Sequence, residues 1–91
     1  MEQEQIFQKD VRSLLRFSAD QVREAEKMIL AGEPKDQILK RLLQSQRALR
    51  VAKALILKEQ FQIYVGSILN GECPETRTEE MRRLITLFPS I

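Results

Sequence analysis

The chain has 91 residues, with 15 Lys or Arg against 13 acidic residues and a formal net charge of +2. It contains no His and a single Cys, which excludes a disulfide framework within the chain and the nitrogen and sulfur ligand set of a transition-metal site. With 43% hydrophobic residues, three Gly and three Pro, it is typical of a single, almost wholly helical domain.

The first predicted helix covers about residues 4–31. Gly32 is placed to end it in the left-handed conformation, and Pro34 is expected in the first turn of the next helix. Because this turn is short, the two helices should be antiparallel neighbours. Spacings of four and three predict a packing seam on the first helix: Phe7, Val11, Leu14, Ser18, Val22, Ala25 and Ile29.

The second predicted helix covers about residues 34–70, and its segment 35–65 contains neither Gly nor Pro. At 1.5 Å per residue this helix is roughly 50 Å long, more than a small domain can bury alone. Its predicted seam comprises Ile38, Leu42, Ser45, Leu49, Ala52, Ile56, Glu59 and Ile63. A flanking apolar set comprises Leu39, Leu43, Ala48, Val51, Leu55 and Phe61. One partner helix cannot cover both sets, so the sequence predicts self-association.

The third predicted helix covers about residues 77–88, opened by a capping box over 76–79 and ended by Pro89. Its expected buried stripe is Met81, Leu84, Ile85 and Phe88. The fold class is therefore all-α, one domain over residues 1–91 with a medium, a very long and a short helix. We expect it to assemble as an antiparallel four-helix-bundle dimer, paired again as a dimer of dimers.

Charge is concentrated on the second helix. Residues 35–70 carry seven Lys or Arg against two acidic residues, whereas the segments on either side are slightly acidic. The main basic residues there are Lys40, Arg41, Arg47, Arg50, Lys53 and Lys58, and those on one face of the first helix are Arg12, Arg16, Arg23 and Lys27. In an oligomer these stripes would form a broad positive surface suited to a phosphate backbone. A solvated helix face with pairs such as Arg16 and Asp20 is the alternative.

Other classes of function find little support in the sequence. Enzymatic activity and a cofactor are not expected, because the chain has no His, no paired Cys and no Gly-rich phosphate loop. The lone Cys73 beside Glu72 and Glu75 is expected to be inert. It fits a reducing cytosol, the first five residues lack a basic signal-peptide region, and the uncharged stretch 61–70 is too short for a membrane span. We therefore predict a cytoplasmic protein with no membrane partner.

Several short matches in order along the chain resemble one family. They are Gln21-Val22-Arg23, Met28-Ile29, Ile38-Leu39, Gln46, Ala48-Leu49-Arg50, Glu59 and Val65. This pattern resembles the copper-sensitive operon repressor family, the CsoR-like metal- and aldehyde-responsive transcriptional repressors. It runs without a gap from about Leu14 to Val65, and the third helix matches in kind.

The resemblance implies a dimer or tetramer that covers double-stranded operator DNA with a basic helical face. In the family's Arg-rich first-helix stretch, Arg16 and Gln21 match, and Arg50 matches a basic position on the second helix. The candidate DNA-binding residues are Arg12, Arg16, Gln21, Arg23, Lys27, Arg47, Arg50 and Lys53.

The sensor positions depart from the family. Where its copper-binding members carry Cys, His and Cys, this chain has Lys35, Gln60 and Tyr64. None of these is a ligand for a soft metal, so no metal is expected and the sensor site is degenerate. Gln60 and Tyr64 either line a pocket for an unknown small-molecule inducer or fill a subunit interface. Glu59 either pairs with Lys35 of another subunit, forms a salt bridge at the rim of the interface, or turns to solvent.

Two hypotheses follow for function. The first is a DNA-binding transcriptional repressor with a degenerate sensor site. The second is an oligomeric helical scaffold that has lost DNA binding and works through a protein partner.

Overall fold

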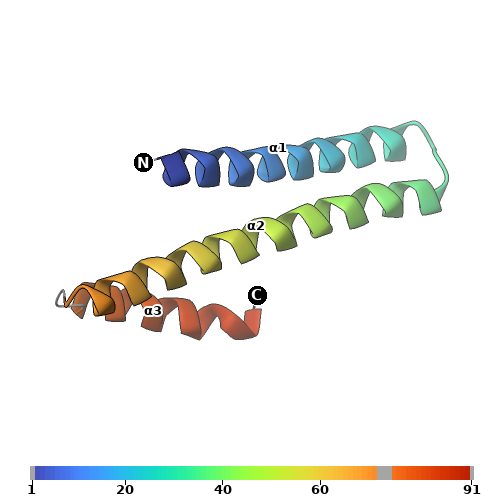
Figure 1. The fold of residues 1–91 in the computed structure, drawn as a ribbon. Helices are drawn as coiled ribbons and strands as arrows, with labels where there is room; N and C mark the ends of the chain where they lie inside the picture. Colours follow the sequence, from blue (N-terminus) through green and yellow to red (C-terminus); the bar gives the residue numbers. More distant parts are fainter. Residues whose placement is uncertain (1, 72–74, 91) are drawn as a thin grey trace. The chain divides into compact units, whose positions relative to one another are not determined.

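The structure is a computed structural model that describes residues 2–71 and 75–90, apart from the side chains of residues 2–6, 76, 77 and 88. The described chain is all-α, and each helix begins and ends within two residues of its expected bounds. The helices, shown in Figure 1, are α1 (Glu2–Leu30), α2 (Lys35–Leu69), α3 (Glu75–Leu87) and the short 3-10 helix η1 (Phe88–Ser90). In the described parts of the chain, no helix has the length and apolar character needed to cross a membrane.

The chain divides into two compact units, and the boundary between them lies within α2. The first unit, Met1–Leu55, is an antiparallel hairpin of α1 and the first part of α2 (Figure 1). The second unit, Ile56–Ile91, contains the rest of α2 together with α3 and η1.

The turn between α1 and α2 is built around Gly32, as expected from the sequence. Its φ of 72° lies in the left-handed region. The Glu33 amide donates to the Met28 carbonyl at 3.0 Å, and the Gly32 amide donates to the Ile29 carbonyl at 3.2 Å. This is the Schellman arrangement, which satisfies carbonyls that the end of a helix would otherwise leave unpaired.

The sequence predicts Pro34 in the first turn of α2. In the structure α2 begins at Lys35, so Pro34 lies directly before the helix. Its carbonyl accepts hydrogen bonds from the amides of Gln37 at 3.1 Å and Ile38 at 3.3 Å. Pro34 therefore caps α2, a position at which its missing amide donor costs nothing.

Alanine substitutions at two glycines are expected to have opposite effects on stability. An added Cβ would meet no atom within 4 Å at either Gly32 or Gly66, so packing does not differ between them. Gly32→Ala should lower the free energy of unfolding by about 1 kcal/mol, because alanine is strained at positive φ. Gly66 lies inside α2, so Gly66→Ala should raise this free energy by about 0.5–1 kcal/mol through helix propensity. Urea denaturation followed by circular dichroism measures the free energy of unfolding of both variants. A stabilising Gly32→Ala would contradict the turn geometry.

The hairpin core is a series of layers, and each layer of buried residues contains at least one small residue. Val11, Ser18 and Ala25 recur every seven residues on α1 and are 8%, 4% and 2% exposed. On α2, the buried Ile38, Ser45 and Ala52 recur at the same interval. The contact between Ser18 and Ser45 fixes the antiparallel register, which places Val11 opposite Ala52 and Ala25 opposite Ile38. A seven-residue period is the packing pattern of a left-handed coiled coil.

This seam differs from the expected one. Ala48, assigned from the sequence to the flanking set, is buried at 6% exposure. Five residues expected in the seam are exposed instead: Val22 (48%), Ile29 (59%), Leu42 (37%), Leu49 (40%) and Ile56 (39%). Alanine and serine let two helices approach closely, so the hairpin buries its small residues and leaves larger ones outside.

Two polar layers interrupt the apolar core of the hairpin. The Ser18 and Ser45 hydroxyl oxygens are 2.6 Å apart, and the Ser18 hydroxyl also donates to the Ser45 carbonyl at 3.2 Å. In the next layer toward the turn, Arg41 Nη1 donates to Gln21 Oε1 at 3.3 Å. No described buried side-chain polar atom lacks a partner, so these layers restrict the register without leaving an unpaired group.

In the second unit, α3 runs back beside the last part of α2 (Figure 1). Ser67 and Met81 are each 6% exposed, and the Ser67 hydroxyl donates to the Ile63 carbonyl at 3.0 Å. The rest of the expected α3 stripe is only partly buried: Leu84 is half-buried, Ile85 is 54% exposed, and the Phe88 side chain lies outside the described residues.

The side chains of residues 76 and 77, where the expected capping box begins, lie outside the described residues, and α3 begins at Glu75. Glu79, the last residue of that box, pairs forward with Arg82 at 3.2 Å and Arg83 at 3.8 Å, because residues three and four apart share a helix face. Cys73 lies outside the described residues.

Candidate nucleic-acid interface

Basic residues line the face of α1 that points away from the hairpin core. Arg16 follows the buried Val11 by five residues, and Arg23 follows Ser18 by the same interval. At about 100° per residue, this interval places them roughly on the opposite side of the helix from the seam. Lys9 precedes Arg16 by seven residues and continues the row. We call the exposed basic residues of this face the α1 edge: Lys9, Arg12, Arg16, Arg23 and Lys27.

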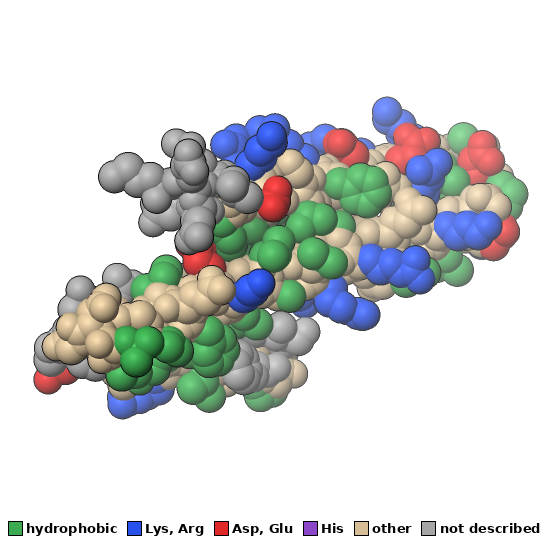
Figure 2. All heavy atoms as spheres, in the orientation of Figure 1, with side chains coloured by type: hydrophobic (Ala, Val, Ile, Leu, Met, Phe, Trp, Pro, Cys, Tyr) green, Lys and Arg blue, Asp and Glu red, His purple; other side chains and the backbone are tan. Residues whose placement is uncertain are grey.

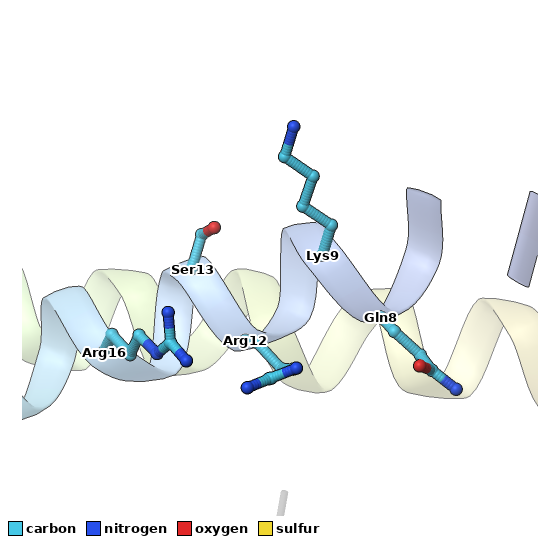
Figure 3. A pocket seen from close by; sticks show the side chains of 5 residues that line it. All are labelled: Gln8, Lys9, Arg12, Ser13 and Arg16. Atoms are coloured by element: carbon cyan, nitrogen blue, oxygen red, sulfur yellow. The ribbon is translucent and has the colours of Figure 1, made fainter. Parts of the chain in front are cut away.

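Part of the α1 edge surrounds an open hollow on the helix surface. Its lining is Gln8, Lys9, Arg12, Ser13 and Arg16. In Figure 3, Lys9 and Ser13 extend to one side of the helix, Arg12 and Gln8 to the other, and the Arg16 guanidinium lies between them. No acidic residue lines the hollow, and none of its three cations forms a salt bridge with a described residue. Three cations without a carboxylate partner among the described residues give this stretch of helix surface the positive charge and donors that contact phosphate oxygens.

Sequence reasoning assigned Arg12 and Arg16 to this surface but missed Lys9, Ser13 and Gln8. The seven-residue interval that links Lys9 to Arg16 and Arg23 is the signal that would have found Lys9. Nothing in the spacing identifies Gln8 or Ser13, because their place in the hollow depends on how the neighbouring side chains extend.

Other expected DNA contacts on α1 have partners within the chain. Arg23 pairs with Asp20 at 3.0 Å, whereas the sequence suggested Arg16 as the partner of Asp20. Both side chains of this pair are about two-thirds exposed, so the pair is weak and exchangeable. Gln21 is half-buried and accepts the hydrogen bond from Arg41, so its amide is directed toward α2 rather than outward.

A second row of exposed cations lies on α2. We call it the α2 edge: Lys40, Arg47, Arg50 and Lys53. Between Asp36 and Glu59 the helix carries no acidic residue, so the field of this row is not offset along its own helix. Arg41, by contrast, is half-buried in the hairpin core.

The two rows lie on opposite sides of the hairpin. Arg50 follows the buried Ser45 by five residues, as Arg16 follows Val11, so both point away from the shared core. Figure 2 shows hydrophobic side chains between the helices and Lys and Arg side chains along both edges of the first unit, with Asp and Glu side chains among them on the upper edge. The single chain therefore presents two separate basic edges, and the broad positive surface expected of an oligomer stays a prediction.

The former sensor positions fall in different units of the chain. Lys35 is exposed at the start of α2, in the first unit. Gln60 and Tyr64 are half-buried one turn apart in the second unit. In the described residues, no group of three or more His, Cys, Asp and Glu side chains could hold a metal ion.

Comparison with known proteins provides no relative: no family model matches the chain, and neither does any curated protein or solved structure.

Proposed function

We propose that this protein is an oligomeric DNA-binding transcriptional regulator, a repressor of the type that the CsoR-like resemblance implies, with a degenerate sensor site. The observation that carries the proposal is the cluster of Lys9, Arg12 and Arg16, exposed and without a carboxylate partner in the described chain. Lys and Arg on a regular helical surface are the groups that neutralise DNA phosphates. The acid-free row on α2 presents a second positive surface.

Oligomerisation is part of the proposal. Within the first unit, five large apolar residues follow a seam residue by four positions, and we call them the apolar flank: Leu15, Val22, Ile29, Leu42 and Leu49. In an antiparallel pair, these positions of both helices lie on the same side of the seam. Their exposures run from 37% to 59% in the single chain. A second hairpin packed against this flank would form the antiparallel four-helix-bundle dimer, and two dimers would form the tetramer.

The inducer of such a regulator would not be a soft metal. Lys35, Gln60 and Tyr64 supply an ammonium, an amide and a phenol, none of which is a good ligand for Cu(I). The repressor is accordingly either constitutive or controlled by a small molecule that occupies the half-buried region around Gln60 and Tyr64.

DNA binding is expected to be strongly salt-dependent and to be weakened by loss of the α1 edge. Fluorescence anisotropy with the chain's own upstream duplex should show an affinity that falls steeply between low and physiological salt. The double variant Arg12→Ala/Arg16→Ala should bind roughly tenfold or more weakly and should reduce the salt slope by about two.

The matched control is Arg82→Ala/Arg83→Ala, which removes the same charge from exposed positions of α3 that pair with Glu79. It should bind DNA almost as the unmodified protein does. Absence of binding to any duplex at low salt would contradict the proposed function, and preference for the upstream duplex over a scrambled one would distinguish a regulator from a general DNA binder.

The alternative is a helical scaffold that acts through a protein partner. Apolar residues exposed in the second unit favour it, and they are Phe61, Val65, Ile68, Leu69, Ile85 and Leu87. Clusters of exposed apolar side chains mark protein-binding surfaces more often than nucleic-acid-binding ones. This function predicts no DNA binding at low salt.

A further inference from the structure

The two basic edges of the hairpin point in opposite directions, so a single straight duplex cannot contact both. Each helix is about 10 Å across with its side chains and neighbouring axes lie about 8–10 Å apart, so the outer surfaces of the hairpin are roughly 20 Å apart. A duplex is a stiff rod that cannot fold around an object of this width. One duplex on the α1 edge therefore leaves the α2 edge unoccupied.

The two edges are also electrostatically independent. At physiological ionic strength the screening length is about 8 Å, well below the width of the hairpin. A duplex bound through Arg12 and Arg16 therefore neither neutralises nor repels groups at Arg47 and Arg50. The second edge keeps its own capacity to bind phosphates.

Self-association through the apolar flank would leave both edges accessible. Leu15 and Leu49 follow seam residues by four positions, whereas Arg16 and Arg50 follow them by five. The flank therefore lies beside the seam and the edges lie opposite it. A second copy on the flank would cover the leucines and would leave both arginines exposed.

We propose that the hairpin binds two separate duplexes at once, one on the α1 edge and one on the α2 edge, and so bridges DNA segments. This inference rests on the proposed DNA binding and adds to it the number of duplexes and the way they are held. The partner is double-stranded DNA recognised through its phosphates, without a requirement for sequence at the second contact. A regulator of this kind would join two sites on one DNA molecule by closing a loop between them.

The test is a two-duplex capture experiment with the full chain. One duplex is immobilised and saturated with protein, unbound protein is washed away, and a second, fluorescent duplex is added. We expect the unmodified protein to retain the fluorescent duplex and to release it when salt is raised. Anisotropy with a single duplex, measured in parallel, reports whether DNA is bound at all.

Variants of each edge measure separately what the α1 edge and the α2 edge contribute to capture of the second duplex. Arg12→Ala/Arg16→Ala weakens the α1 edge, and Arg47→Ala/Arg50→Ala weakens the α2 edge. Each should still saturate the immobilised duplex at raised protein concentration, yet should capture at most one-tenth of the fluorescent duplex. Arg82→Ala/Arg83→Ala on α3, equal in charge change, should capture normally.

Two results would overturn the inference while leaving DNA binding intact. One is tight binding of the first duplex with no capture of the second by the unmodified protein. The other is undiminished capture by a variant that lacks one edge, since bridging would then come from several copies of the same edge in an oligomer. Failure to bind even a single duplex at low salt would instead contradict the proposed function itself.

Discussion

Replacing Ala52 by Leu is expected to lower the free energy of unfolding by about 3 kcal/mol, at the upper end of the range for overpacked cores. Ala52 is 2% exposed on the hairpin seam, where the register places it opposite Val11. The flanking layers contain Ala48 and Ser45, so helix approach along this stretch depends on small side chains. A leucine here would force the helices apart and would disturb the neighbouring layers.

Ala54→Leu is the matched control, because Ala54 is exposed two residues further along the same helix. Alanine and leucine have similar helix propensities, so the control should change stability by less than about 0.5 kcal/mol. Val11→Ala combined with Ala52→Leu exchanges the large and small partners and should recover part of the loss. Denaturant unfolding followed by circular dichroism measures the free energy of unfolding of all three variants. Equal stability of the two leucine variants would show that helix approach at this layer is not limited by side-chain size.

Introducing a charge into the apolar flank is expected to abolish self-association. Leu49 is 40% exposed in the single chain and lies opposite Leu15 on the flank proposed to contact a second copy. Burying one leucine contributes about 1.5–3 kcal/mol, and a two-fold dimer contains the residue twice. Leu49→Glu should therefore weaken the dimer by at least about 3 kcal/mol, which is more than a hundredfold in dissociation constant.

Sedimentation equilibrium over a range of protein concentrations measures this dissociation constant. Leu30→Glu is the control, because Leu30 is 82% exposed at the turn end of α1, outside the flank. It should leave the assembly unchanged. The unmodified protein should unfold at a higher temperature as its concentration rises, and Leu49→Glu should lose this dependence. A monomeric unmodified chain at every concentration would contradict the oligomer, whatever the variants do.

Local features of the fold were predictable from the sequence alone. The sequence predicted the three helices, their bounds to within two residues, and the left-handed turn at Gly32. These features depend on short-range chemistry: helix propensity, the amide donor that proline lacks, and backbone sterics. The acid-free stretch of α2 is likewise a property of the sequence.

Tertiary structure alone decided which apolar face packs inside the hairpin and where the charges point. The sequence offers both a leucine face and an alanine and serine face on α2, and periodicity favours neither. The antiparallel register pairs Val11 with Ala52 and Ser18 with Ser45, which fills the seam with small residues and leaves Leu42 and Leu49 exposed. The same register turns Arg16 and Arg50 to opposite sides, because each lies across its own helix from the shared seam. Spacing along one helix determines the face of each residue, but only the packing of the second helix determines what that face meets.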